Sequence, residues 1–116
     1  MKKYMLILFE GDHVYTELSP EDLQQEIMAH GKWIEELGDR FLGGEALEEP
    51  SKIIRGKEKV VTDGPYIESK ELVGGYYLIA AKDLEEATEI SKGCPVLQYG
   101  GGIEVRPVME IDGMDE

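Results

Sequence analysis

Two stretches of the sequence are apolar at every position, and this feature constrains the fold most. Residues 4–9 read YMLILF and residues 76–81 read YYLIAA. Because successive side chains of a strand point to opposite faces, each stretch predicts a strand whose two faces both need covering. The strands are expected over residues 2–9 and 71–81. We therefore expect both inside a sheet that is packed on its two sides.

Two helices are predicted beside these strands. The first runs from about residue 20 to 37, with Ser19 as N-cap and Gly38 as C-terminal cap. The second begins after the capping residue Asp83 and ends near Gly93. The apolar stripe of the first helix consists of Leu23, Ile27, His30, Ile34 and Leu37. That spacing predicts a helix with one face on the sheet.

Shorter strands complete the pattern. Residues 41–47 are expected to form one strand and residues 51–61 a hairpin. Residues 103–111 have apolar side chains at alternate positions, which predicts a strand with one apolar face. The order β-α-β-β-β-α-β predicts an α+β, ferredoxin-like subunit with an antiparallel sheet and two helices on one face. The length favours a single domain over 1–116, with 110–116 as a frayed tail.

The second face of this sheet predicts a partner. Two helices cover only one face of a four-stranded sheet, yet residues 4–9 and 76–81 are apolar on both faces. An identical sheet packed face to face would cover the exposed side. We therefore expect a homodimer.

Charge argues against several other partners. The chain has 12 Lys and Arg residues against 25 Asp and Glu, a formal net charge of −13. Such a surface repels phosphate backbones and anionic lipid, so we expect no nucleic-acid and no membrane partner. Residues 4–9 are also far shorter than the roughly 18 residues of a membrane span. The single cysteine, Cys94, favours a cytoplasmic location.

Cofactor and metal signatures are weak. The glycines at 100–102 precede a strand, whereas a phosphate loop precedes a helix. Two histidines and one cysteine without close spacing make no recognisable zinc set. We expect neither a cofactor nor a metal.

His30 and Glu45 are the candidate catalytic residues. An imidazole on an apolar stripe suits acid/base chemistry near neutral pH, although structural histidines are also common there. Glu45 follows Gly43-Gly44, where a ligand or backbone has room to approach, and its carboxylate would orient the imidazole. A solvent-facing role for Glu45 is the alternative.

Four further residues are candidates for ligand binding. Asp63 belongs to the stretch VTDGPYIESKE, in which a proline after Asp-Gly prevents an ordinary hairpin turn. Its carboxylate would cap the freed amides or accept from Lys70, and both of these roles are structural. Whether the loop also forms the wall of a pocket with His30 is left open by the sequence. The other three are strand or loop tyrosines, each with core packing as the alternative: Tyr76, Tyr77 and Tyr99.

The stretches VTDGPYIESKELVGGYYLI and CPVLQYGGGIEVRPV resemble the DGPF-motif branch of the YCII-related family, with Tyr66 where that branch usually has phenylalanine. The resemblance extends over residues 2–108. It implies a dimeric α+β barrel of ferredoxin-like subunits. It also implies a histidine–aspartate pair, with the histidine at His30 and the aspartate's place taken by Cys94.

Two functions remain open. The first is an enzyme of lyase, isomerase or dehalogenase type, a class to which the resemblance points. It would use His30, with Glu45 in place of the aspartate, on a small organic ligand. The second is a non-catalytic dimeric module that binds a metabolite or regulates a partner. A pocket with convergent polar groups favours the first, and a filled interior the second.

Overall fold

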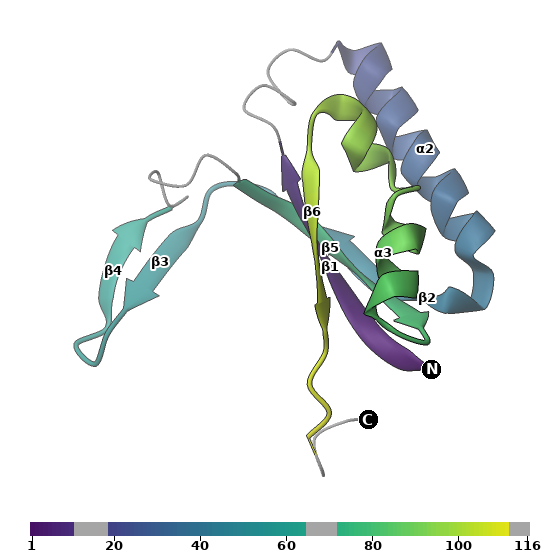
Figure 1. Ribbon diagram of the computed structural model, residues 1–116. Helices are drawn as coiled ribbons and strands as arrows, with labels where there is room; N and C mark the ends of the chain where they lie inside the picture. Colours follow the sequence, from purple (N-terminus) through teal and green to yellow (C-terminus); the bar gives the residue numbers. More distant parts are fainter. Residues whose placement is uncertain (11–18, 65–71, 112–116) are drawn as a thin grey trace.

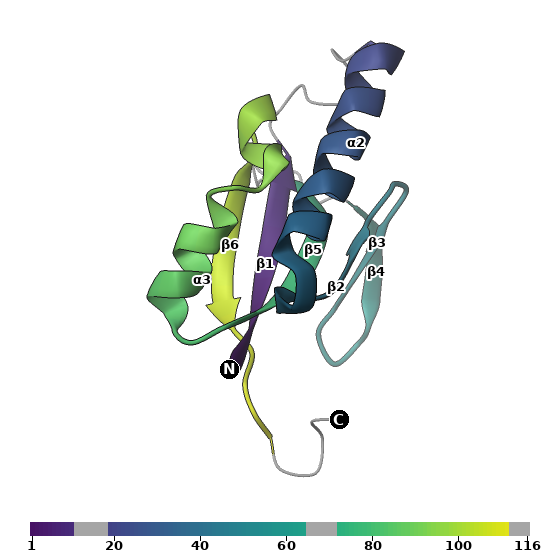
Figure 2. The same ribbon diagram turned by 90° about the vertical axis from the view of Figure 1, so that its right-hand side faces the viewer.

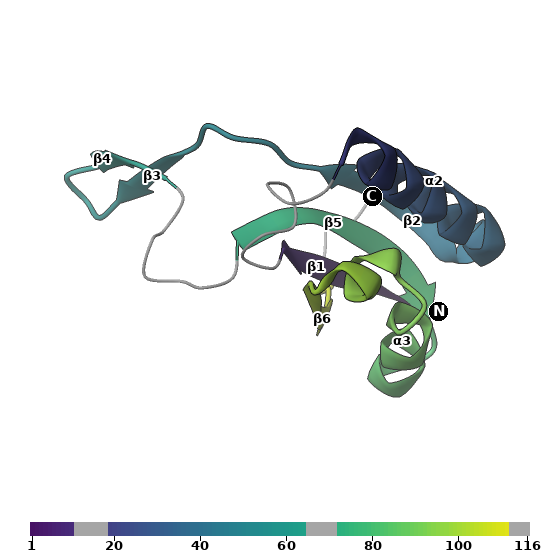
Figure 3. The same ribbon diagram turned by 90° about the horizontal axis from the view of Figure 1, so that it is seen from above.

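The computed structural model describes residues 1–10, 19–64 and 72–111 and contains one four-stranded antiparallel sheet. Its strands, in the order β2-β5-β1-β6, are β1 (Lys2–Glu10), β2 (Phe41–Ala46), β5 (Leu72–Ala81) and β6 (Gly102–Pro107). A separate hairpin consists of β3 (Lys52–Arg55) and β4 (Val60–Asp63). It projects away from the sheet, at the far end from the helices (Figures 1 and 3).

Two α-helices lie on one face of the sheet, as Figure 2 shows. They are α2 (Pro20–Leu37) and α3 (Leu84–Ser91), and short 3₁₀ helices follow each: η1 (Gly38–Arg40) and η2 (Pro95–Tyr99). This arrangement confirms the predicted ferredoxin-like α+β fold with both helices on one face. The hairpin is an insertion between β2 and β5.

The predicted helix ends are confirmed. The Ser19 side chain accepts a hydrogen bond from the Asp22 backbone N–H at 3.1 Å, and Pro20 occupies the first turn of α2. Gly38 ends α2 with a φ of 58°, a conformation that favours glycine. The Asp83 side chain accepts from the Glu86 N–H at 2.8 Å and caps α3.

The core lies between the helices and the sheet. Its strand residues share the helix-covered face and include Tyr4, Leu6, Leu8, Ile79 and Ala81. On the other face of β1, Met5, Ile7 and Phe9 are only half-buried. The expected second apolar face is therefore present and incompletely covered within the described residues.

The buried line of α2 differs from the predicted stripe. Ile27 is 57% exposed, whereas Trp33 and Glu26 are buried, with only 7% of each exposed. The bulky indole turns its own side of the helix toward the sheet, because it removes the most apolar area from water there. Glu26 lies on the same side of α2, so its carboxylate is buried as well, although the apolar spacing did not predict it.

The C-terminal strand is shorter than expected. β6 ends at Pro107, although the Val108 N–H still donates to the Lys3 carbonyl at 3.0 Å. Met109 is 74% exposed and Ile111 43%. Residues 112–116 of the expected tail lie outside the described residues.

Candidate active site

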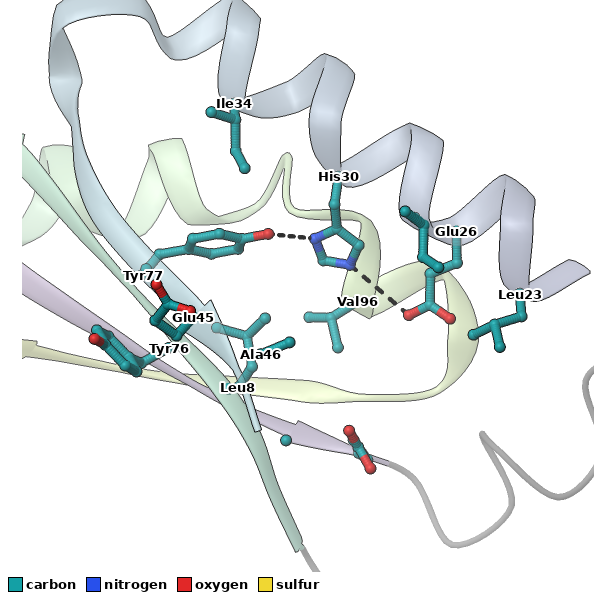
Figure 4. Close-up of a pocket in the computed structure, with 15 residues that line it drawn as sticks. Leu8, Leu23, Glu26, His30, Ile34, Glu45, Ala46, Tyr76, Tyr77 and Val96 are labelled. Carbon is teal, nitrogen blue, oxygen red and sulfur yellow. Dashed lines mark hydrogen bonds and ion pairs between the residues drawn. The ribbon is translucent and has the colours of Figure 1, made fainter. Parts of the chain in front are cut away.

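A pocket of about 310 Å³ lies between α2 and the sheet. Figure 4 shows His30 and Glu26 entering it from α2 and Tyr77 from β5. Most of the wall is apolar and includes Leu8, Leu23, Ile27, Ile34, Ala46 and Val96. The volume is at the small end for ligand sites, so the pocket suits a small molecule.

His30 is bonded to Tyr77 at the centre of the pocket. Nδ1 of the imidazole lies 2.7 Å from the phenol oxygen of Tyr77. The Tyr77 ring is itself held in place, with its centroid 5.4 Å from Trp33 and 5.9 Å from Phe41. The histidine is therefore oriented by a side chain that the core fixes.

Gly44 creates the space that the Tyr77 ring occupies. A Cβ at this position would stand 2.6 Å from Cδ1 of Tyr77 and 2.5 Å from the Tyr76 carbonyl oxygen. Glycine is thus required here by close approach, as expected of the Gly43-Gly44 pair.

Glu26 lies on the other side of the imidazole. It precedes His30 by one turn of α2, and its Oε1 is 3.8 Å from Nε2, too far for a hydrogen bond. Its second carboxylate oxygen, Oε2, is buried and has no hydrogen-bond partner among the described residues. Nε2 and Glu26 thus face a space that a substrate atom could enter.

Burial changes the proton affinities of these groups. Desolvation lowers the pKa of His30 below its ordinary 6.5, so the imidazole is neutral at pH 7. Desolvation, followed by repulsion from Glu10, raises the pKa of Glu26 above its ordinary 4.5. Burial also raises the pKa of Tyr77 to about 12, so its phenol keeps its proton.

The hydrogen bond between His30 and Tyr77 is compatible with either neutral tautomer of the imidazole. If Nδ1–H donates to the phenol oxygen, Nε2 carries a lone pair and can accept a proton from a ligand. If the phenol O–H donates to Nδ1, Nε2–H points toward Glu26 and can give a proton. The same contact therefore supports both halves of acid/base catalysis.

Glu10 is held next to the pocket by a bulge in the sheet. Leu8 pairs with Gly75 and Phe9 with Val73, so Gly74 is an extra residue on β5. The Glu10 carboxylate fills the space that a Cβ on Gly74 would occupy. Two carboxylates, Glu10 and Glu26, thus line the pocket.

Comparison with protein families identifies the chain. Residues 1–112 match the YCII-related domain. The chain belongs to this family. A comparison of this chain with curated proteins found no match.

A solved structure with similarity to this YCII-related domain is 5-chloro-2-hydroxyhydroquinone dehydrochlorinase (TftG) from Burkholderia phenoliruptrix AC1100, in complex with 2,5-dihydroxybenzoquinone. It is 16% identical to the chain, and the match covers 96% of this chain and 99% of that chain with a TM-score of 0.49.

The expected pairing of His30 with Glu45 is wrong. Glu45 pairs with Tyr76 across β2 and β5, and Gly44 pairs with Tyr77. Because neighbouring strand positions face opposite sides, the side chains of Glu45 and Tyr76 are directed to the face of the sheet away from Tyr77, although both residues border the pocket. The partners of His30 among the described residues are Tyr77 and Glu26.

Two of the other candidates lie away from the pocket wall. Tyr99 is the last residue of η2, and Asp63 is on the projecting hairpin, where it forms a 2.5 Å ion pair with Lys52. The Asp63 side chain is 83% exposed. Residues 65–71, which continue the loop considered as a pocket wall and include Lys70, lie outside the described residues.

Cys94 cannot supply the charge of an aspartate. The thiol is 1% exposed, and burial raises its pKa to about 11. It is therefore a neutral core group at physiological pH.

Glu26 is the site residue that the sequence interpretation missed. Its position one turn before His30 was an available signal, because residues four apart share a helix face. The burial of Trp33, seven positions further on, points to the same side of α2.

The described residues show no group of three or more His, Cys, Asp or Glu side chains arranged to hold a metal ion. None of the described helices is long and apolar enough to cross a bilayer.

Proposed function

We propose that this YCII-related domain is an enzyme that moves a proton on a small organic molecule, in a reaction of lyase, isomerase or dehalogenase type. His30 is the acid/base residue. The observation that carries the proposal is a neutral imidazole fixed by Tyr77 at Nδ1, with Nε2 open to the pocket beside a buried carboxylate.

The three polar side chains divide the work. Nε2 of His30 removes a proton from a carbon or hydroxyl of the substrate when Nδ1–H donates to Tyr77, and the contact with Tyr77 orients the ring. Glu26, whose pKa burial raises, is a second group that can exchange a proton with the substrate or the imidazole. The apolar wall excludes water from the reacting atoms and strengthens these interactions.

A homodimer is part of this proposal. Apolar side chains on the uncovered sheet face, among them Ile7, Phe9 and Leu78, are half-buried in the single chain. Three apolar side chains of the hairpin, Ile54, Val60 and Val61, are 57–66% exposed among the described residues. Because an isolated hairpin is marginally stable, a second copy that covers sheet and hairpin supports both. The DGPY sequence at 63–66 further leads us to propose membership of the DGPF-motif branch.

A non-catalytic binding module is the second candidate. Such a module was expected to have either a filled interior or a cavity lined by tyrosines. The open pocket with convergent polar groups favours the enzyme, although Tyr77 does line it.

Proton exchange with solvent tests the enzyme without knowledge of its substrate. A panel of small ketones, phenols, quinols and amines is incubated with the protein in D₂O, and loss of C–H signals is followed by proton NMR. We expect exchange of at least one compound with the wild type and its loss in His30→Gln. Glu45→Gln, on the far face, is the matched control and keeps the rate. Compounds that bind without exchanging would support the binding module instead.

A further inference from the structure

The polar part of the pocket wall is acidic. The carboxylates of Glu10 and Glu26 line the pocket, whereas no Lys or Arg does so in the described ranges 1–10, 19–64 and 72–111. His30 is neutral there at pH 7 because burial disfavours its charged form. An anionic ligand would therefore meet like charges without a compensating cation.

One carboxylate oxygen of Glu26, Oε2, lacks a hydrogen-bond donor among the described residues. Its side chain is 9% exposed, and Oε1 is 3.8 Å from His30 while Oε2 has no partner among the described residues. Buried carboxylate oxygens are normally satisfied, because desolvation without a hydrogen bond is unfavourable. The missing donor is supplied most directly by a ligand in the pocket.

The second carboxylate makes a cationic donor the best match. Glu10 is close enough to Glu26 to disfavour its ionisation. A neutral hydroxyl would satisfy one oxygen but leave this repulsion in place. A positively charged N–H donor relieves the repulsion and forms the stronger, charge-assisted hydrogen bond.

We propose that the pocket selects a small ligand with a protonated amine, which binds Glu26 and Glu10 while an apolar body lies along Leu8, Ile34 and Val96. This assignment names the substrate class of the proposed enzyme and rests on that function. It places the ammonium at the Glu26 side of His30. A carbon next to the amine then lies nearest Nε2.

Three probes with the same ring test the charge preference. Benzylamine, benzyl alcohol and benzoate present a cation, a neutral donor and an anion on nearly the same body. Their Kd values are measured by protein-observed NMR at 150 mM salt and pH 7.5. We expect benzylamine to bind about tenfold or more tightly than benzyl alcohol, with benzoate the weakest, as a charge-assisted hydrogen bond requires.

Variants locate the effect. Glu26→Gln should abolish the preference for benzylamine over benzyl alcohol, with folding verified by its NMR spectrum. Glu35→Gln removes the same charge from an exposed position of α2 and should keep the preference, which separates Glu26 from the general field of an acidic protein. Equal binding of the amine and the alcohol, tightest binding of benzoate, an unchanged preference in Glu26→Gln, or no binding by any probe would overturn the proposal.

The outcome is separable from that of the proton-transfer proposal. His30→Gln should retain the benzylamine preference while losing solvent exchange. If exchange occurs but benzoate is favoured, the enzyme proposal stands and the amine assignment fails. If benzylamine is favoured but no amine or carbonyl compound exchanges, the ligand assignment stands and the acid/base role of His30 fails.

Discussion

Nδ1 of His30 and the phenol oxygen of Tyr77 are 2.7 Å apart, although 47 positions separate the two residues in the chain. The contact joins α2 to the central strand β5 across the pocket between the helix and the sheet. Because the Tyr77 ring packs on Trp33 and Phe41, the orientation of the imidazole depends on the sheet as much as on its own helix.

Tyr77→Phe should separate this hydrogen bond from the ring packing. The aromatic contacts remain, and the free energy of unfolding should fall by about 1 kcal/mol, the net value of one such bond. Urea unfolding followed by circular dichroism measures the change. Tyr76→Phe removes the same hydroxyl from the far face and should leave the pocket unchanged. A Tyr77→Phe protein with wild-type stability and wild-type proton exchange would show that the contact has no role.

Glu26→Gln should change how stability depends on pH. A carboxyl whose pKa is raised by folding contributes most below its ordinary 4.5, and this contribution is lost as pH rises through the folded value. Gln at this position does not ionise. The variant should therefore gain stability relative to the wild type as the pH rises above 4.5, by about 1 kcal/mol once Glu26 is ionised in the folded protein, because it avoids an unsatisfied buried charge.

Denaturant titrations at a series of pH values measure this difference. His30 has the opposite sign: its lowered pKa gives a contribution that is complete above 6.5 and is lost as pH falls. Because its sign is opposite, the contribution of His30 is distinguished from that of Glu26 by the direction of the change with pH. Glu35→Gln serves as the exposed control. A stability difference that did not vary with pH would mean that Glu26 titrates normally in the folded protein.

The fold followed from local patterns that agree with one another. Apolar runs on both faces identified the central strands, and Ser19, Gly38 and Asp83 located helix ends to within a residue or two because their side chains or φ angles suit only those positions. The hairpin was visible from its turn. Its separation from the sheet was not, because strand propensity does not specify a pairing partner.

The site was only partly predictable, since it depends on which face each strand turns to the helices. Phe41 pairs with Ile79 and Gly43 with Leu78, so Leu42 is an extra residue in β2. A regular strand would have put Glu45 on the same face as Phe41 and thus near His30. The bulge shifts the alternation by one residue and sends Glu45 to the far face.

Gly44→Ala should disturb the site from the strand side. The new Cβ would lie 2.6 Å from the Tyr77 ring and 2.5 Å from a backbone oxygen, so the backbone or the ring must move. We expect a loss of about 1–3 kcal/mol, typical of overpacking, and a weaker His30 contact visible in the imidazole NMR signals. Gly31→Ala on α2 meets nothing within 4 Å and should stabilise the helix by about 0.5–1 kcal/mol. If both substitutions were stabilising, close packing of Gly44 against Tyr77 would be disproved.

Ile7→Glu should break the proposed homodimer. Ile7 lies at the centre of the uncovered sheet face, where it pairs with Tyr76 of β5 and Glu104 of β6. A carboxylate there would be desolvated against its copy in a face-to-face pair, which opposes association strongly. Sedimentation equilibrium at micromolar concentration should give a dimer for the wild type and a monomer for the variant. Met28→Glu, which replaces a 64% exposed apolar residue on α2, is the control and should stay dimeric. A wild-type protein that sediments as a monomer would remove the basis for a second subunit, and the uncovered face would then need another explanation.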